Sequence, residues 1–444
     1  MLLFTLVLSL VVWIAPAAAV AETNQLFAPA QTLALPGRGM AVAWSPDGTR
    51  IAAGGHFRGN QVVPQPPKSN LRYDTKVYDV ASGALLKSFD CHGFWVVALA
   101  WAAVPELGME LLADGGGDHA VKVWDADGPG STSCKLGQYL VKDGALPEIA
   151  ERAVTNAKGV TTVQKRNGLL EINGWILALA FSPDRRFLAG ASKDGSLRLW
   201  QVTPGRNQWK VVRLWNPRLG EQVTSVSWRP DRRALVTSDR LGRIATWSFD
   251  PRPMPDGDLW DDASVDEFAK QDQSAYWSWN WRYPTRVRRD PVWQYEPTRT
   301  LKNGTARPVK VPSWNARYSP DGQHVAAVWT DGTFVVFDAA TGSEIRRTTI
   351  TNDRNKPVAL HGLDWSPDGR LIAIGGADNL IRLYDGSTGT LVDTLAGHND
   401  LVTAVAWSPD GRRLASTAGG IRVNLEGNFD VAGPDTSVLV WDRH

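Results

Sequence analysis

One eight-residue phrase recurs along the chain and limits what the chain can fold into. AVAWSPDG occurs twice without change, at 41–48 and at 404–411. Its variants are GLDWSPDG at 362–369, NARYSPDG at 315–322, ALAFSPDR at 178–185, SVSWRPDR at 225–232 and a degenerate copy, ALAWAAVP, at 98–105. Such self-similarity predicts one structural unit repeated seven times, with insertions where the gaps are wide. Length alone would suggest two or three domains for 444 residues.

Each copy predicts local structure. The alternating run before the phrase is typical of a strand with one buried face. Ser-Pro-Asp-Gly then predicts a tight turn, because proline fixes φ, aspartate bonds its own backbone and glycine accepts a positive φ. A second apolar run follows, and after a polar turn a third run ends in an aromatic residue, as in SLRLW ending at Trp200. Each unit therefore predicts three strands, with a fourth in the segment before the next unit.

These units resemble the repeats of the WD-repeat β-propeller family. The Trp-Asp ending is literal at Trp124-Asp125 and Trp441-Asp442. The family's turn aspartate, six residues before the strand aromatic, is matched by Asp118, Asp194, Asp331, Asp378 and Asp435, and its loop histidine by His92 and His398. The resemblance implies an all-β fold, a single seven-bladed β-propeller of four-stranded blades over residues 29–444. It also implies internal hydrogen-bond networks of His398, Ser416, Asp435 and Trp441 in the seventh unit and of His92, Asp118 and Trp124 in the second.

Closure of the ring needs one more strand. The chain stops at WDRH, one strand short of a seventh blade, whereas QTLALPG at 31–37 reads like the fourth strands elsewhere. We expect the N-terminal segment to supply the missing strand, which removes an exposed sheet edge.

Four insertions, at about 56–71, 142–173, 250–292 and 419–434, interrupt the repeats. The third predicts a short helix from Ser264 through Phe268, which opens with a capping box. The second predicts a helix from Leu146, because proline follows it, and a hairpin that turns at Asn167-Gly168. Residues 293–303 are expected to be the fourth strand of blade four.

Aromatic residues at period two mark the insertion after blade four. Trp277, Trp279, Trp281 and Tyr283 place four rings on one face of a strand. We favour packing against the blade, because large exposed apolar patches are uncommon on soluble proteins. The alternative is a ligand platform for a glycan or another planar molecule.

Two tryptophans occupy matching places, six residues before their strand aromatics. Trp95 and Trp175 would open the first strands of their blades at the rim that the family often uses for partners, and exposed aromatics make good interface anchors. Phe94, Lys193 and Arg240 complete this candidate partner-binding set. The alternative is packing against a neighbouring blade or an insertion.

The N-terminus predicts export. Residues 2–14 are almost wholly apolar and lead to Ala19-Val20-Ala21, so residues 1–21 resemble a signal peptide of a periplasmic or secreted protein. An uncleaved anchor is the alternative, because no Lys or Arg precedes the apolar run. No other segment suggests a membrane span. The net charge of only +2 gives no field that would hold nucleic acid.

Catalytic motifs are absent from the sequence: there is no G-x-S-x-G, H-E-x-x-H, P-loop or G-x-G-x-x-G. We therefore expect no cofactor and no metal. The sequence favours an exported, non-enzymatic protein-interaction scaffold that binds an unidentified protein partner. A glycan or small-ligand binding protein is the second hypothesis, and a hydrolase, lyase or oxidoreductase built on the propeller is the weakest.

Overall fold

The structure is a computed structural model of the 444-residue chain. The described residues form mainly strands and turns, and they contain no α-helix. They are 26–56, 73–105, 108–118, 120–128, 150–155, 161–166, 175–195, 197–203, 210–215, 222–251, 285–287, 291–300, 306–419, 421–423, 429–431 and 435–443.

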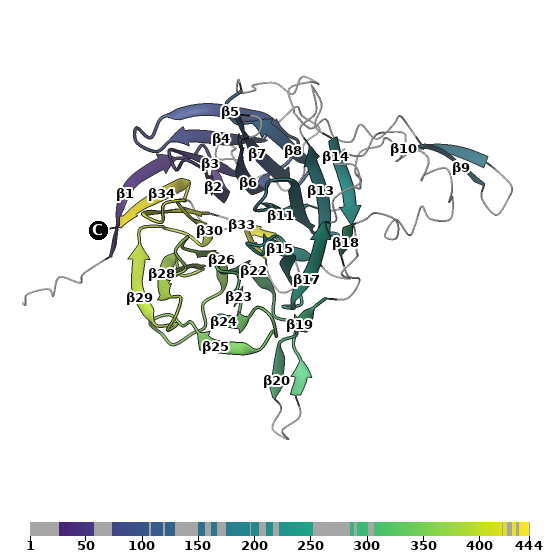
Figure 1. Ribbon diagram of the computed structural model, residues 1–444. Helices are drawn as coiled ribbons and strands as arrows, with labels where there is room; N and C mark the ends of the chain where they lie inside the picture. The colour runs from purple at the N-terminus through teal and green to yellow at the C-terminus, as the bar shows by residue number, and fades with distance from the viewer. Residues whose placement is uncertain are drawn as a thin grey trace, which may run out of the picture.

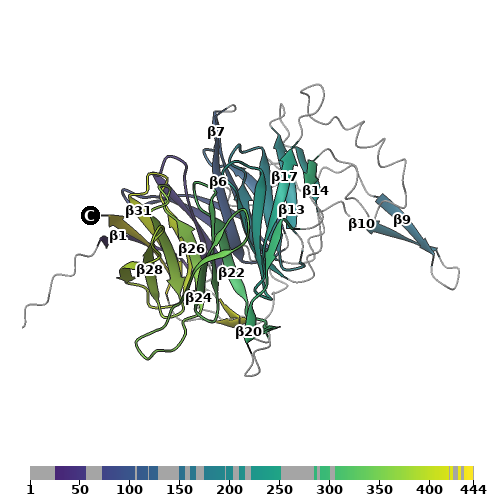
Figure 2. The same ribbon diagram turned by 60° about the horizontal axis from the view of Figure 1, so that its bottom comes forward.

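Seven antiparallel sheets, the blades, stand around a common axis (Figure 1). The expected seven-bladed β-propeller is confirmed. Turning the molecule shows that the strands of all blades run between the same two faces (Figure 2).

The first four blades have these strands in order. Blade one holds β2 (Arg38–Trp44), β3 (Arg50–His56), β4 (Tyr73–Asp79) and β5 (Leu85–His92), and blade two holds β6 (Val96–Val104), β7 (Met109–Gly116) and β8 (Val121–Asp125) among its described residues. Blade three holds β11 (Ile176–Phe181), β12 (Phe187–Ser192), β13 (Leu197–Thr203) and β14 (Lys210–Trp215). Blade four holds β15 (Val223–Trp228), β16 (Ala234–Asp239), β17 (Ile244–Pro251), β18 (Thr285–Val287) and β19 (Trp293–Tyr295).

The last three blades follow the same order. Blade five holds β22 (Ser313–Tyr318), β23 (His324–Trp329), β24 (Thr333–Asp338) and β25 (Glu344–Thr349), and blade six holds β26 (Leu360–Trp365), β27 (Leu371–Gly376), β28 (Leu380–Asp385) and β29 (Leu391–Ala396). Blade seven holds β30 (Val402–Trp407), β31 (Arg413–Ala418), β34 (Ser437–Arg443) and, as its outer strand, β1 (Phe27–Ala34).

The repeated turn joins the first and second strands of a blade. In blade seven the Ser408 hydroxyl donates to Asp410 at 2.6 Å and accepts from the backbone N–H of Arg413 at 2.9 Å. Gly411 completes the turn at φ 68°, a conformation that glycine adopts without strain. The same Ser and Asp bonds recur at Ser45 and Ser366, so one local chemistry sets the strand pairing of several blades.

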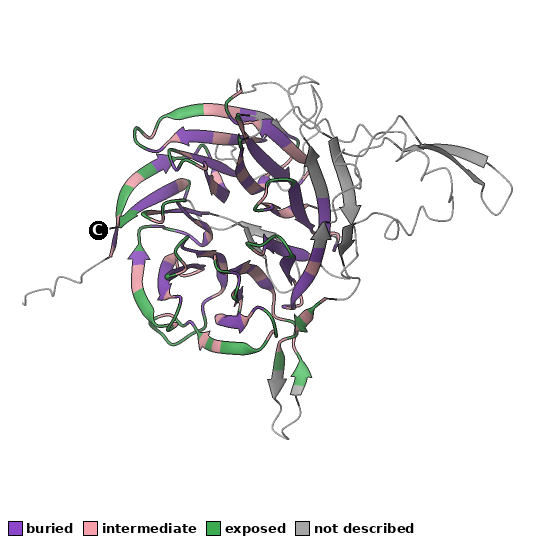
Figure 3. Ribbon diagram, in the orientation of Figure 1, coloured by how far each residue is buried: buried purple, intermediate pink, exposed green. Residues whose placement is uncertain are grey.

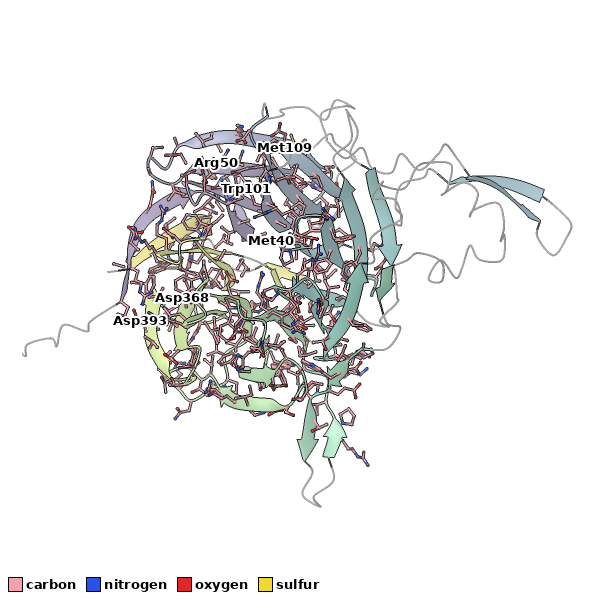
Figure 4. The ribbon with its side chains drawn as sticks, in the orientation of Figure 1. Met40, Arg50, Trp101, Met109, Asp368 and Asp393 are labelled. Atoms are coloured by element: carbon pink, nitrogen blue, oxygen red, sulfur yellow. The ribbon has the colours of Figure 1, made fainter. Side chains whose placement is uncertain are left out.

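Burial follows the radius of the ring (Figure 3). The second strands β12, β16 and β27 are buried along their whole length, because neighbouring blades cover both of their faces. The outer strand β25 is mostly exposed or half-buried. In Figure 4, Met40 of the first strand β2 lies toward the middle of the ring, whereas Asp393 of the outer strand β29 lies at the rim.

Aromatic side chains also join neighbouring blades. The indole N–H of Trp228 donates to the carbonyl oxygen of Ala180 in blade three at 3.0 Å, and Trp44 bonds Ala406 of blade seven in the same way at 2.9 Å. Arg50 of blade one lies over the Trp101 ring of blade two, 5.2 Å from its centroid. Figure 4 labels both residues in this part of the ring. The repeat aromatic therefore fixes the contact between blades as well as filling its own blade.

The ring closes through the N-terminal strand, as expected. Strand β1 pairs antiparallel with β34 from Phe27 opposite Arg443 to Ala34 opposite Ser437. Phe27 and Leu33 are almost completely buried, and the Phe27 ring meets Trp407 edge-on at 5.4 Å. The strand begins at Phe27, before the expected start of the propeller at residue 29.

Three two-stranded hairpins add to the blades: β9 (Ala150–Thr155) with β10 (Thr161–Arg166), β20 (Thr298–Thr300) with β21 (Ala306–Pro308), and β32 (Ile421–Val423) with β33 (Phe429–Val431). The β9–β10 hairpin lies apart from the ring in both views (Figures 1 and 2). The β32–β33 hairpin belongs to the insertion at 419–434, whereas most of the insertion at 56–71 lies outside the described residues.

Two local predictions are wrong. A helix from Leu146 would run into Ala150–Thr155, which is a strand, and the hairpin turns before Thr161 rather than at Asn167-Gly168. The physical reason is the β-branched content around the turn, which favours extended backbone over a helix that a single proline would start. The predicted helix from Ser264 through Phe268 lies outside the described residues.

The fourth strand of blade four also differs from the single strand expected at 293–303. It is split, with β18 pairing with the end of β17 and β19 with its beginning. The chain then leaves the sheet after Pro297, because proline has no N–H to donate to the ladder. Residues Thr298–Thr300 pair instead with Ala306–Pro308.

The predicted network of blade seven is formed by its four residues. His398 Nδ1 lies 2.9 Å from Asp435 Oδ2, and His398 Nε2 lies 2.8 Å from Ser416 Oγ. The Trp441 indole N–H donates to the same Ser416 oxygen at 2.8 Å. Burial acts against ionisation, but bonds from His398, Ser437 and the Asn399 N–H lower the pKa of Asp435 to about 2.

Blade two contains a more highly charged version of this hydrogen-bond network. His92 Nδ1 lies 2.8 Å from Asp118, as predicted, but its Nε2 lies 3.0 Å from Asp114, which the sequence did not single out. Asp114 takes the place of Ser416 and accepts from the Thr75 hydroxyl of blade one at 2.7 Å. Trp124 packs on Phe89, with ring centroids 4.9 Å apart. Burial would lower the pKa of His92, but Asp118 and Asp114 outweigh burial and raise it to about 9.

Leu33→Ala tests the importance of ring closure. We expect the free energy of unfolding to fall by about 2–5 kcal/mol, because the substitution empties a buried site between β1 and its neighbours. Leu391→Ala is the matched control: its side chain is 53% exposed on the outer strand β29, so a change within about 0.5 kcal/mol is expected. Chemical denaturation of both variants measures the difference, and equal effects would contradict this account of closure.

His92→Asn tests the charged network. We expect a loss of about 3–5 kcal/mol near pH 6, because two carboxylates lose their buried cation. The pKa of His92 rises from 6.5 to about 9 on folding, so its contribution is complete below about pH 6.5 and declines as the pH rises through 9. The difference from wild type in unfolding free energy should shrink accordingly as the pH rises towards 9. His324→Asn, at a side chain that is 39% exposed, is the control and should change the unfolding free energy by about 0.5 kcal/mol or less near pH 6.

Candidate functional site

The predicted partner-binding residues lie at one end of the strands in blades two to four. Trp95 and Trp175 directly precede the first strands β6 and β11, whereas Lys193 and Arg240 directly follow the second strands β12 and β16. First strands begin, and second strands end, at the same face of the ring, which we call the top face. Backbone bonds fix the positions: the Lys193 N–H donates to the Trp175 carbonyl at 2.8 Å, and the Arg240 N–H to Gln222 at 3.0 Å.

Three of these residues form one aromatic cluster across two blades. The Phe94 ring centroid lies 4.8 Å from that of Trp95 and 5.3 Å from that of Trp175. Trp95 and Trp175 meet edge-on at 5.6 Å, with their planes 73° apart. All three side chains are half-buried, so each packs on the others and also reaches the solvent. We call Phe94, Trp95 and Trp175 the top aromatic cluster.

A fourth ring, which the sequence did not indicate, supports the cluster from blade one. Tyr73 lies 6.0 Å from Phe94 and is almost completely buried. Phe94 also lies close against Gly117, where an added Cβ would come within 2.4 Å of its ring. Glycine is required there for that close approach. Tyr73 gave no repeat signal because it directly follows the insertion of blade one, which obscures the spacing.

Two cations flank the cluster. The Lys193 ammonium lies over the Trp175 ring, 4.8 Å from its centroid, in the geometry of a cation–π contact. Burial lowers the pKa of Lys193, and the neighbouring positive charge of Arg240 lowers it further. The top aromatic cluster is thus bordered on the side of blades three and four by partly desolvated positive charge.

Blades five and six carry a second group that the sequence did not single out. Trp314 of β22 stacks on His361 of β26, with centroids 5.5 Å and planes 23° apart. Further along the same two strands, Arg317 and Asp364 lie 3.7 Å apart. Burial raises the pKa of Asp364 despite the nearby Arg317. The repeat pattern masked these residues, because at each of these positions the other first strands carry different side chains.

The predicted ligand platform of Trp277, Trp279, Trp281 and Tyr283 lies outside the described residues and stays a prediction. The part of the chain that the structure describes holds no group of three or more His, Cys, Asp or Glu side chains placed to bind a metal ion. It also holds no helix with the length and apolarity needed to cross a bilayer.

Comparison with known proteins points to one kind of repeat. The family model of the WD domain, G-beta repeat, matches residues 83–125, 167–201 and 389–442. The model of the anaphase-promoting complex subunit 4 WD40 domain matches residues 349–410.

Curated relatives match parts of the chain. The ribosome biogenesis protein ERB1 of Debaryomyces hansenii is 38% identical over 15% of this chain and 8% of its own length. The nuclear distribution protein PAC1-2 of Uncinocarpus reesii is 25% identical over 43% of this chain and 45% of its own. The LST8 homologue of Drosophila melanogaster is 24% identical over 37% and 52%. The chain therefore spans about half or less of the length of each of these relatives.

These matches agree with the repeated turns, the seven blades and the His–Ser–Asp–Trp network of blade seven. The chain therefore contains WD repeats, and the described residues arrange them as a seven-bladed β-propeller.

Proposed function

We propose that the protein is an exported, non-enzymatic scaffold that binds a partner protein through its top face, at the top aromatic cluster. The observation that carries this proposal is the cluster itself. Three half-buried aromatic rings from neighbouring blades pack together and remain in contact with solvent. Binding energy at protein interfaces concentrates in such aromatic anchors, and tryptophan is among the most enriched residue types there.

The environment of the cluster supports an anchor rather than core packing alone. Lys193 and Arg240 lie at its border, and an apolar centre with a polar rim is the usual arrangement at an interface. The rings are also held in place before any partner arrives, by Tyr73 and by the close approach of Phe94 to Gly117. Preorganisation of this kind reduces the entropy lost on binding.

The related proteins support a role as a general binding platform rather than a role in one particular chemical reaction. The names of these relatives concern processes as different as ribosome biogenesis and nuclear distribution, although the proteins share this repeat. One fold serves unrelated functions through different sites. No catalytic motif occurs in the sequence, which supports the non-enzymatic part of the proposal.

Export is the part of the proposal that rests on residues 1–21 alone. Their apolar run and the Ala19-Val20-Ala21 sequence have the order of a signal peptide and its cleavage site. A partner protein would then be met in the periplasm or outside the cell.

Trp95→Ala and Trp175→Ala test the binding site. Each substitution should weaken capture of partner by about 2 kcal/mol, roughly thirtyfold, because it removes a central anchor. The measurement is quantitative affinity capture from the protein's own compartment with wild type and variants side by side. Leu391→Ala, on an outer strand far along the ring, is the control and should capture as wild type does. Wild-type capture by both tryptophan variants, with unchanged unfolding midpoints, would rule out this site.

The leader is tested separately. When the full chain is expressed in a host with a signal peptidase, the exported product should begin at Glu22. Intact-mass measurement and N-terminal sequencing of the product decide the point. A product that retains Met1 and sediments with membranes would support an anchor instead.

A further inference from the structure

The turns between the first and second strands, on the face opposite the top face, differ in one respect. Six of them share the same backbone, in which the fourth residue of the Ser/Arg-Pro-Asp-X turn has a positive φ. Glycine takes this place at Gly48, Gly322, Gly369 and Gly411, with φ between 68° and 71°. In blades three and four the place is taken by Arg185, at φ 62°, and Arg232, at φ 58°.

An arginine at this place is unfavourable for folding. The left-handed conformation brings Cβ close to the backbone carbonyl, so residues other than glycine, asparagine and aspartate seldom adopt it. The rest of the turn does not compensate, since the Arg185 N–H makes the same bond to Ser182, at 2.8 Å, that Gly411 makes to Ser408, at 2.9 Å. Two neighbouring blades therefore keep an arginine where the repeat elsewhere has glycine, and such local strain is often found at functional sites.

The two turns also concentrate positive charge. They carry five arginines, namely Arg185, Arg186, Arg229, Arg232 and Arg233, against two aspartates, Asp184 and Asp231. Arg232 pairs with Asp184, and Arg229 lies 3.3 Å from Asp231, so each carboxylate has one partner already. Arg185, Arg186 and Arg233 are exposed and form no ion pair with the described residues. We call these five arginines the arginine patch.

The patch is one continuous surface rather than two separate turns. Blades three and four are joined just beneath it by the bond from Trp228 to Ala180 and by the contact of Trp228 with Phe187 at 6.3 Å. The Arg232–Asp184 pair itself crosses from blade four to blade three. Blade seven offers a contrast, because its Arg413 donates to the Gly48 carbonyl at 2.8 Å and lies over Trp44, and so has a structural role.

We propose that the arginine patch binds an acidic segment of a protein partner, on the face opposite the top aromatic cluster. Guanidinium groups present parallel N–H donors that match the two oxygens of a carboxylate, and charge-assisted pairs of this geometry are the strong ones. The three unpaired arginines, drawn from both turns, can each receive one carboxylate along an extended acidic peptide. The protein would then have two binding surfaces on opposite faces of one ring.

An acidic protein segment fits this surface better than a nucleic acid does. The arginine patch lies on two short turns, and the whole chain has a formal charge of only +2. Nucleic-acid binding draws its affinity from many phosphate contacts along a basic surface. A peptide with a few carboxylates needs only the local cluster that the two turns provide.

The test uses the full chain and a fluorescein-labelled (Glu-Ser)5 peptide, with (Gln-Ser)5 as the uncharged control, measured by fluorescence anisotropy. Wild type should bind the glutamate peptide, more weakly as salt rises, and should ignore the glutamine peptide. Arg185→Gly/Arg232→Gly should lower affinity about tenfold and, because glycine relieves the left-handed strain, should raise the midpoint of thermal unfolding. Arg186→Ser/Arg233→Ser should lower affinity to a similar extent without raising the midpoint.

Arg412→Ser is the matched control, since Arg412 is an exposed arginine in the corresponding turn of blade seven. It should leave peptide binding unchanged. Equal binding by wild type and both double variants would overturn the proposal, as would loss of binding in Arg412→Ser alone. Tighter binding of a 20-base-pair DNA duplex than of the peptide would overturn it in favour of a nucleic acid. A lower unfolding midpoint for Arg185→Gly/Arg232→Gly would refute the argument from strain.

Discussion

The pairing of β1 with β34 is the contact on which the rest of the ring depends. Every other described blade sheet pairs strands from one continuous stretch of chain, whereas blade seven joins residues 27–34 to residues 437–443. Without this pairing, blade seven would have an open edge, and blades one and seven would be held only by side-chain contacts. Phe27 and Leu33 are buried when β1 pairs with β34, so ring closure combines backbone pairing with the burial of apolar side chains. The strands at the two ends of the chain therefore stabilise each other.

The closed ring explains why the two proposed binding surfaces lie where they do. Neighbouring blades hold their loops side by side. Trp95 and Trp175, which directly precede the first strands of their blades, therefore lie with ring centroids 5.6 Å apart although they are far apart in the chain. The same adjacency brings the turns of blades three and four together on the opposite face, where Arg232 reaches Asp184. The buried inner strands position both sets of side chains, so the two proposed surfaces are held on one scaffold.

The His networks show how far pattern reasoning reaches. His398, Ser416, Asp435 and Trp441 could be named in advance, because the repeat fixes the spacing of these residues along the chain. In blade two the pattern identified His92 and Asp118 but not Asp114, because a carboxylate there departs from the usual serine or threonine. That single difference changes the electrostatics: between two carboxylates the pKa of His92 rises to about 9. Inside the insertion at 142–173 a hairpin was predicted, but its turn was placed at Asn167-Gly168 and its first strand, β9, was taken for a helix, since no repeat constrains that segment.

The amino-acid sequence was enough to predict the number of blades, the strand order within them, the closing strand and the residues of the repeat turn. These follow from local rules: alternation of apolar residues, turn chemistry and repetition, each acting over a few residues. The sequence did not reveal which side chains from different blades touch, such as Phe94 with Trp175 or Trp314 with His361, or which turns combine their charges. Contacts of this kind depend on the twist and spacing of neighbouring sheets, and the spacing between blades is set only when the whole ring has closed.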